Sequence, residues 1–293
     1  MYASIFRKGI FDGRTIVITG GGSGIGRCTA HELASLGAKV LITGRNVEKL
    51  ERTAGEIRQD GGTVAHYVFD IRDEELVRST VAAMLADHGI IDGLVNNAGG
   101  QYPMPLESIS KKGWEAVLAT NLTGGFLVAR ELYTQCMKAS GGAIVNMIAN
   151  MWGGMALMGH SGVARAGMMN FTKTAALEWA SSGVRVNAVA PGPIASSGAD
   201  HYDATVLRSA MLPQVMKGLP LKRLGEEAEV SSAIVYLLSP GAAYITGTCI
   251  RIDGGASLVP FLLELPEHTK SEPYRGFHRA SSPDALKNHS SHP

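Results

Sequence analysis

The chain has 293 residues, and 27 Lys and Arg against 26 Asp and Glu give it a formal net charge of +1. Hydrophobic residues make up 45% and charged residues 18%, as in a folded globular protein, so extended disorder is excluded. The near-neutral balance argues against a nucleic-acid partner, which needs a basic surface. No apolar run reaches the roughly 18–20 residues that span a bilayer.

Short apolar runs alternate with longer amphipathic stretches along the chain. Strands are predicted at 15–19, 40–43, 63–69, 93–96, 143–147, 184–190 and 248–252, and helices at 24–36, 47–59, 74–87, 114–139, 161–181 and 227–238. This alternation is typical of βαβ units with a parallel sheet covered on both faces. We therefore expect an α/β fold: a single-domain, Rossmann-type, doubly wound parallel sheet of about seven strands.

Two regions lie outside this pattern. Residues 192–219 are rich in Gly, Pro, Ser and Met and follow the sixth strand, at the edge of the sheet where ligands bind, so a substrate lid is expected there. Residues 258–293 are polar and contain five prolines. We expect one domain over 1–257 and a C-terminal extension over 258–293 that either wraps a neighbouring subunit or extends into solvent.

A glycine-rich run joins the first strand to its helix. Gly20, Gly24 and Gly26 allow a tight turn, close approach of a pyrophosphate and close helix–strand packing, and Ser23 and Ile25 lie between them. The helix N-terminus adds free N–H groups and partial positive charge. The run predicts a dinucleotide site, with a glycine turn that binds no ligand as the alternative.

The end of the second strand favours one form of the cofactor. No carboxylate that could bind the ribose hydroxyls of NAD(H) appears there before Glu48, whereas Arg45 could pair with a 2′-phosphate. NADP(H) is therefore expected rather than NAD(H), unless Arg45 is only a solvated loop cation. Asp70 could bind the adenine amino group or cap the next helix, for which Asp73 is better placed.

Further motifs carry a family resemblance. They are Asn96-Asn97-Ala98-Gly99, Asn121 within 120–124, Pro191-Gly192-Pro193-Ile194 and Asp253-Gly254-Gly255. Together with the glycine run, these motifs cover about residues 12–257. The chain resembles the short-chain dehydrogenase/reductase family. The resemblance implies that Ile71, Asn97, Ala98 and Gly99 lie on the adenosine and ribose side of the cofactor, and that Pro191, Gly192 and Ile194 meet the nicotinamide. It also implies a homotetramer or homodimer, with the helices at 114–139 and 161–181 at interfaces.

The chain departs from the family's usual Ser, Tyr and Lys set. The Tyr position falls on Ser161, the Lys position on Arg165, and the Ser position on Ile148 or Ala149. A serine hydroxyl is a far weaker acid than a phenol, and an arginine does not release its proton. Ser161 and Arg165 share a helix face, so they are expected to stabilise an oxyanion rather than to exchange protons.

Two other catalytic candidates accompany this pair. The resemblance implies that Asn121 interrupts its helix and holds a water, against a reading as an ordinary helical Asn. His160 is a candidate proton donor or else a packed histidine, and Ser161 is either an oxyanion donor or the N-cap of its helix.

Reduction of a C=C bond conjugated to a thioester requires a group that stabilises the negative charge on the thioester oxygen, and Ser161 and Arg165 can supply it. The segment 159–167 resembles the trans-2-enoyl-CoA and 2,4-dienoyl-CoA reductase group, and the run 27–33 resembles bacterial citronellol or citronellal dehydrogenases. We expect an NADPH-dependent 2-enoyl-CoA reductase. An alcohol dehydrogenase of terpenoid or lipid alcohols and a non-catalytic NADP(H)-binding protein remain alternatives.

The substrate is expected to be a small molecule, either an acyl-CoA or an isoprenoid. Gln101, Tyr102, Met151, Met155 and Tyr202 are its candidate contacts, the methionines as a pliable lining or as plain core, and the two tyrosines as substitutes for the missing phenol. No metal site is expected. Three widely spaced cysteines and a C-terminus unlike a peroxisomal signal predict a cytoplasmic protein.

Overall fold

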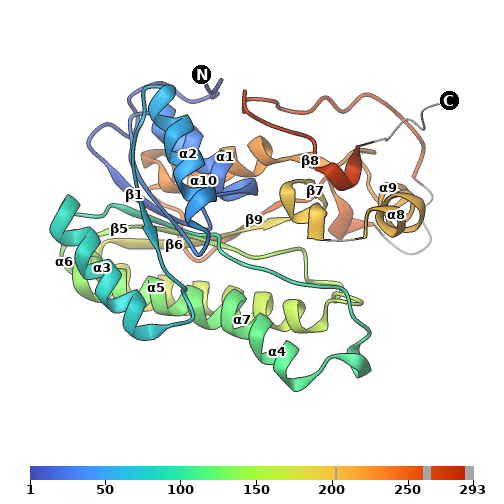
Figure 1. The fold of residues 1–293 in the computed structure, drawn as a ribbon, viewed down its shortest axis with the longest axis horizontal. Helices are drawn as coiled ribbons and strands as arrows, with labels where there is room; N and C mark the ends of the chain where they lie inside the picture. The colour runs from blue at the N-terminus through green and yellow to red at the C-terminus, as the bar shows by residue number, and fades with distance from the viewer. Residues whose placement is uncertain (202, 260–264, 288–293) are drawn as a thin grey trace.

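The computed structural model describes residues 1–201, 203–259 and 265–287. Its strands form a parallel sheet of seven in the order β3-β2-β1-β4-β5-β6-β9, and β7 and β8 form a separate pair (Figure 1). The bounds are β1 Thr15–Thr19, β2 Lys39–Gly44, β3 Thr63–Val68, β4 Gly93–Asn96, β5 Gly142–Met147, β6 Val184–Pro191, β7 Ile194–Ala195, β8 Gly225–Glu226 and β9 Cys249–Ile252. The predicted Rossmann-type fold is confirmed.

Helices cover both faces of the sheet (Figure 1). One face carries α1 Gly24–Ser35, α2 Val47–Gln59 and α10 Glu227–Leu238, and the other carries α3 Glu74–His88, α5 Gly124–Leu132 and α7 Gly159–Glu178. Local caps define several starts: Asn46 accepts from the backbone N–H of Lys49 at α2, and Asp73 accepts from that of Leu76 at α3.

The predicted helix over 114–139 is longer and interrupted twice. It begins as α4 (Lys111–Leu118), passes through the π-helical turn η2 (Ala119–Thr123) into α5, and ends through a second π turn, η3 (Tyr133–Met137), in α6 (Lys138–Ser140). Such turns occur frequently at functional sites. Asn121 lies in η2, so the expected interruption at this residue is confirmed.

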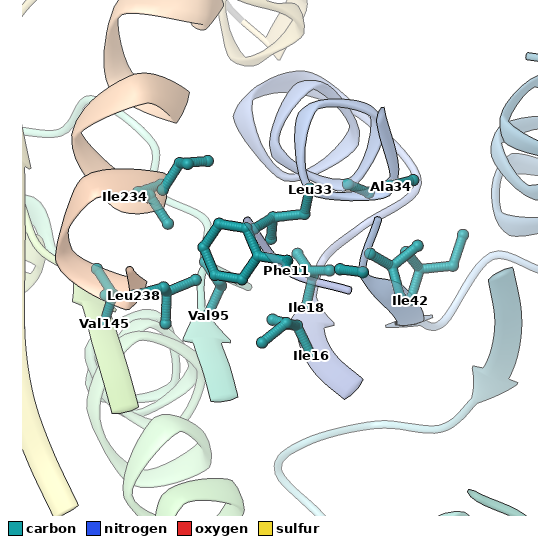
Figure 2. Close-up of a cluster of buried hydrophobic side chains, with 14 of the residues drawn as sticks. Phe11, Ile16, Ile18, Leu33, Ala34, Ile42, Val95, Val145, Ile234 and Leu238 are labelled. Carbon is teal, nitrogen blue, oxygen red and sulfur yellow. The ribbon is translucent and has the colours of Figure 1, made fainter. Parts of the chain in front are cut away.

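The core on the α1 side of the sheet contains Phe11 at its centre (Figure 2). Side chains of the central strands and of α1 and α10 surround it, including Ile18, Leu33, Ile234 and Leu238. Strand β1 is buried along its whole length, and its three central residues, Ile16, Val17 and Ile18, are apolar, as expected for a strand covered on both faces. The strand order makes β1 and β4 neighbours, and their following loops open the crevice at the point where the order reverses.

The segment predicted to be a substrate lid, called the lid below, and the C-terminal tail complete the structure. After β7, the lid contains η5 (Ser197–His201), α8 (Ala204–Val206), η6 (Leu207–Met211) and α9 (Leu212–Lys217). The tail, residues 265–287, ends in the 3-10 turn η9 (Asp284–Leu286) and packs on its own chain: Tyr274 Oη donates to Ala3 O at 2.7 Å. Within the described part of the chain, no helix is long and apolar enough to cross a bilayer.

Candidate active site

A cavity of about 540 Å³ lies at the carboxyl ends of the central strands. The glycine run, the loop after β4, helix α7, the loop after β6 and the lid all contribute to its walls. Of the predicted cofactor and catalytic residues, the following line it: Gly20, Ser23, Gly24, Ile25, Asn97, Ala98, Gly99, Arg165, Pro191, Gly192 and Ile194. The topology therefore brings together segments that are far apart in the sequence.

The glycine run has the geometry of an anion cradle. Gly20 and Gly24 have φ of +67° and +56°, a region that side-chain-bearing residues rarely adopt. A Cβ on Gly26 would lie 2.4 Å from the carbonyl oxygen of Gly20, so this glycine serves packing and does not face the cavity. The Ser23 side chain makes no capping bond, which leaves the N–H groups at the start of α1 for a ligand. These residues fit a dinucleotide pyrophosphate.

Thr19 holds the loop after β4 against the glycine run. Its Oγ1 accepts from the backbone N–H groups of Asn97 and Ala98, at 3.0 and 2.9 Å, while Asn97 Nδ2 donates to Thr19 O at 2.9 Å. The side chain of Asn97 is therefore bound to the protein itself. We infer that its contribution to the cavity is mainly through its backbone.

A half-buried carboxyl beside the cradle was not predicted from the sequence. Glu227 begins α10, and its Oε1 lies 3.8 Å from the position that a Cβ on Gly24 would occupy. Burial raises the pKa of this carboxyl to about 7. A partly neutral carboxyl limits the repulsion that a full negative charge would exert on a pyrophosphate.

The residues after β2 and β3 form a small exposed charge cluster. Arg45 is 67% exposed in its side chain, and its Nη1 lies 4.0 Å from Asp70 Oδ2. Arg72 binds the same carboxylate, with Nε 2.9 and 3.0 Å from the two oxygens, and lowers the pKa of Asp70. Arg72 was not among the predicted site residues. Ile71 is buried beneath Gly124, where a Cβ would meet its side chain, so it supports this loop from within the core.

Arg165 is the centre of the catalytic candidates. It is 8% exposed, its Nη1 donates to Met147 O at 2.6 Å, and its Nη2 donates to Asn121 Oδ1 at 3.0 Å. Asn121 in turn bonds both backbone groups of Gly100: its Nδ2 donates to Gly100 O at 2.6 Å, and its Oδ1 accepts from Gly100 N at 3.0 Å. The π-helical turn thus positions one side chain that fixes both the guanidinium and the loop after β4.

The charge on Arg165 has no counter-ion among the described residues. Its Nε is buried without a hydrogen-bond partner, and burial lowers the pKa of the guanidinium to about 10. Isolated buried charges are costly. A buried cation on a cavity wall is therefore suited to a ligand that carries or develops negative charge.

Ser161 and His160 are fully buried at the start of α7, beside Arg165 but outside the set of described residues that line the cavity. Ser161 Oγ donates to Gln101 Oε1 at 2.6 Å, and Gln101 does line the cavity. His160 Nδ1 accepts from the backbone N–H of Ser161, and its ring packs edge-on against Tyr102. Because α7 begins at Gly159, the reading of Ser161 as an N-cap is wrong.

The positions predicted to correspond to the family's usual catalytic residues do not carry those residue types. Ile148 and Ala149, where the family's Ser is expected, both line the cavity without a hydroxyl. Among the described lining residues, Arg165 is the only side chain with an ionisable group. No cluster of potential metal ligands occurs in the described ranges either.

The apolar lining differs from the predicted substrate contacts. Met151 and Met155 are half-buried and lie outside the described lining, with Met155 packed against Gly162, and Tyr102 is also absent from it. The lid and the tail supply the lining instead, through Leu207, Met211, Leu212, Val215 and Leu286. Tyr202 lies outside the described residues.

The chain is similar to known proteins over most of its length. The family model described as "Enoyl-(Acyl carrier protein) reductase" matches residues 20–257. A protein named probable 2,4-dienoyl-CoA reductase from Bacillus subtilis is 37% identical over 251 residues, 85% of this chain and 98% of its own. A peroxisomal 2,4-dienoyl-CoA reductase from Danio rerio is 35% identical, over 88% and 86% of the two chains.

A solved structure is more similar in sequence. The citronellol catabolism dehydrogenase AtuB of Pseudomonas aeruginosa is 61% identical, with a TM-score of 0.79, and the match covers 87% of this chain and 100% of that chain. The relatives therefore carry two kinds of name, one for reduction of enoyl thioesters and one for a terpenoid alcohol pathway.

Proposed function

The chain belongs to the short-chain dehydrogenase/reductase family, whose members are oxidoreductases with a nicotinamide cofactor, and we propose that it uses NADPH to reduce the C2=C3 double bond of a 2-enoyl thioester such as an acyl-CoA. The single observation that carries this proposal is the buried, unpaired cation of Arg165 in a cavity whose described lining holds no other ionisable side chain. The names of the dienoyl-CoA reductase relatives support the thioester class.

The reaction matches the groups that the site retains. Addition of a hydride at C3 places negative charge on the thioester oxygen as an enolate, and a fixed cation stabilises that charge. Interconversion of an alcohol and a carbonyl requires a group that exchanges the hydroxyl proton, which Arg165 does not do at neutral pH. The described cavity therefore suits the first chemistry better than the second.

The cofactor would lie on the residues predicted for it. The cradle of Gly20, Ser23 and Gly24 would bind the pyrophosphate, and Arg45, joined by Arg72, would bind a 2′-phosphate. When bound, the reduced nicotinamide would supply two electrons and a proton as a hydride. No carboxylate follows the second strand before Glu48, and Asp70, which follows the third strand, is paired with Arg72.

The chain's own polar residues would then orient the substrate. Asn121 and the carbonyl of Met147 fix the guanidinium of Arg165, so its charge is preorganised. The hydroxyl of Ser161 donates to Oε1 of Gln101 and so fixes the orientation of this amide. The amide N–H groups of Gln101 would then donate to the substrate oxygen. The proton at C2 would come from water, because His160 is buried behind Tyr102.

A second candidate is an alcohol dehydrogenase acting on a terpenoid alcohol such as citronellol. The 61% identity to the Pseudomonas aeruginosa citronellol catabolism dehydrogenase favours it. It needs a proton-exchanging group, and the described part of the site offers none on the cavity wall. Both candidates share an apolar chain in the cavity.

The test follows NADPH absorbance with a medium-chain trans-2-enoyl-CoA and with citronellal, and NADP⁺ reduction with citronellol. Arg165→Met removes the charge, and Lys173→Met removes a charge from the exposed face of the same helix as a control. We expect thioester turnover that falls about 100-fold or more in Arg165→Met and stays unchanged in Lys173→Met. Turnover of citronellol without turnover of the thioester would reject the proposal in favour of the second candidate.

We further propose that the protein is a cytoplasmic homotetramer or homodimer. Helices α5 and α7 leave apolar side chains on the surface: Leu177 is 81% exposed, Val163 50% and Phe126 37%. Apolar groups exposed together on neighbouring helices are typical of an interface. Light scattering that gives a monomer mass would contradict this part of the proposal.

A further inference from the structure

The C-terminal tail travels across the molecule and returns to the lid. After the lid and β9, the red end of the chain in Figure 1 runs to the N-terminal segment and then back beside α8 and α9. At the far end of this path, Ala3 N donates to Gly276 O at 2.8 Å and Tyr274 Oη donates to Ala3 O at 2.7 Å. The returning segment, 277–287, therefore starts from a point that is fixed to the N-terminal segment.

The first attachment is a docking site on α1 and α2. Phe277 is 4% exposed, and its ring lies 5.7 Å from that of Tyr2 and 5.1 Å from that of His31. Arg279 donates from Nε and Nη2 to the two oxygens of Asp60, at 3.0 and 2.9 Å. This combination of a buried aromatic ring and a two-pronged ion pair fixes where the returning segment begins.

The second attachment is to the lid itself. Arg208 of η6 donates from Nη1 to Lys287 O at 2.9 Å, and the backbone N–H of Ala285 donates to Asp200 Oδ1 of η5 at 3.1 Å. Ala285 is 4% exposed. The turn η9 is thus held between two lid elements, through its backbone and independently of the side chain at position 286.

The side chain that this arrangement places on the cavity is Leu286. It lines the same cavity as Arg165, together with the apolar lid residues Leu207 and Met211. We propose that Leu286 is a specificity-determining residue, which sets the size of the apolar chain that the cavity accepts. The identity of that chain as the acyl or isoprenoid part of a thioester rests on the proposed function, whereas the role of Leu286 as an apolar wall does not.

Changes of side-chain volume at this position should move the preferred chain length in opposite directions. Leu286→Ala opens space, and each additional buried methylene contributes about 0.8 kcal/mol, so two more carbons should gain about tenfold in kcat/KM relative to the wild type. Leu286→Trp fills space and should shift the preference toward shorter chains by a similar factor. Lys287→Ala, next to it and exposed, should leave the profile unchanged.

The experiment measures two profiles on the full-length protein. The first is kcat/KM over a series of trans-2-enoyl-CoA chain lengths with NADPH. The second needs no turnover: with NADP⁺ present, straight-chain fatty alcohols of increasing length displace a fluorescent anilinonaphthalene sulfonate probe. Circular dichroism and thermal unfolding verify that each variant is folded.

The outcomes separate this inference from the proposed function. Opposite shifts in both profiles support the two together. A shifted binding profile in a protein that turns over no thioester rejects the proposed function and retains the role of Leu286. Profiles of folded Leu286→Ala and Leu286→Trp that match that of Lys287→Ala overturn the inference, as does a wild-type cavity from which no alcohol displaces the probe.

Discussion

Replacing Gly99 by alanine should disable the site while the fold persists. The added methyl carbon would lie 2.7 Å from Nη2 of Arg165 and 2.7 Å from Oδ1 of Asn121, two atoms that a 3.0 Å hydrogen bond joins. Because carbon contacts are normally about 3.5 Å or longer, both groups must move by roughly 0.8 Å or the backbone must yield. The substitution therefore displaces the guanidinium of Arg165 and leaves its charge unchanged.

The expected losses follow from this displacement. A misplacement of about 1 Å near the reacting atoms can lower a rate about 100-fold, so we expect kcat/KM for the enoyl thioester to fall by about that factor. Overpacking costs about 1–3 kcal/mol of unfolding free energy, which urea denaturation would measure.

Gly100→Ala is the matched control, since nothing lies within 4 Å of its added carbon. If Gly99→Ala is folded and its kcat/KM stays within about threefold of that of Gly100→Ala, the argument for a fixed Arg165 is refuted.

Three further predictions concern the cofactor, the core and the effect of pH. Arg45→Ala should raise the KM for NADPH about tenfold and leave the KM for NADH unchanged, because Arg45 is proposed to bind the 2′-phosphate that only NADPH carries. Equal changes in the two KM values would contradict this role of Arg45. Leu33→Ala should cost about 2–5 kcal/mol in urea denaturation, since Leu33 is fully buried, whereas Leu177→Ala, 81% exposed, should cost little. The raised pKa of Glu227 should stabilise the protein below about pH 4.5, and this contribution should be lost as pH rises through about 7, because the folded state holds the proton more tightly than the unfolded state. Glu227→Gln should remove that part of the pH dependence of unfolding, and an unchanged profile would count against it.

Local signals explain why most of the fold was predictable. The central strands β1 and β4 carry short buried runs of mainly apolar residues because both faces of the sheet are covered. Helices α2 and α3 follow the N-caps Asn46 and Asp73, whose side chains accept the expected backbone bonds. The glycine run was equally predictable, since positive φ at Gly20 and Gly24 is a requirement of the turn itself.

Contacts between distant segments explain what the sequence analysis missed. Gln101 and Ser161 are 60 residues apart, and no periodicity indicates that one holds the other. Leu286 reaches the cavity through contacts at both ends of the returning segment, where Phe277 packs on His31 and Arg208 of the lid donates to Lys287 O. Met151 and Met155 were expected either on the cavity or in the core, and they lie outside the described lining, to which the lid and the tail contribute Leu207, Met211 and Leu286. Such placement depends on the complete fold.

The substitutions at the family's Tyr and Lys positions form a coherent set rather than a simple loss. Ser161 is fully buried with its hydroxyl on Gln101, so a tyrosine ring would have to displace that side chain or distort the start of α7. Arg165 bonds Met147 O and Asn121 simultaneously, and a lysine nitrogen reaches two such acceptors only by moving. Ser161→Tyr with Arg165→Lys should therefore fail to restore alcohol oxidation unless Gln101 is also reduced in size. If the double variant oxidises citronellol with NADP⁺ while Gln101 is unchanged, the site accommodates the Tyr and Lys pair as it stands, and the argument from the packing around Ser161 is refuted.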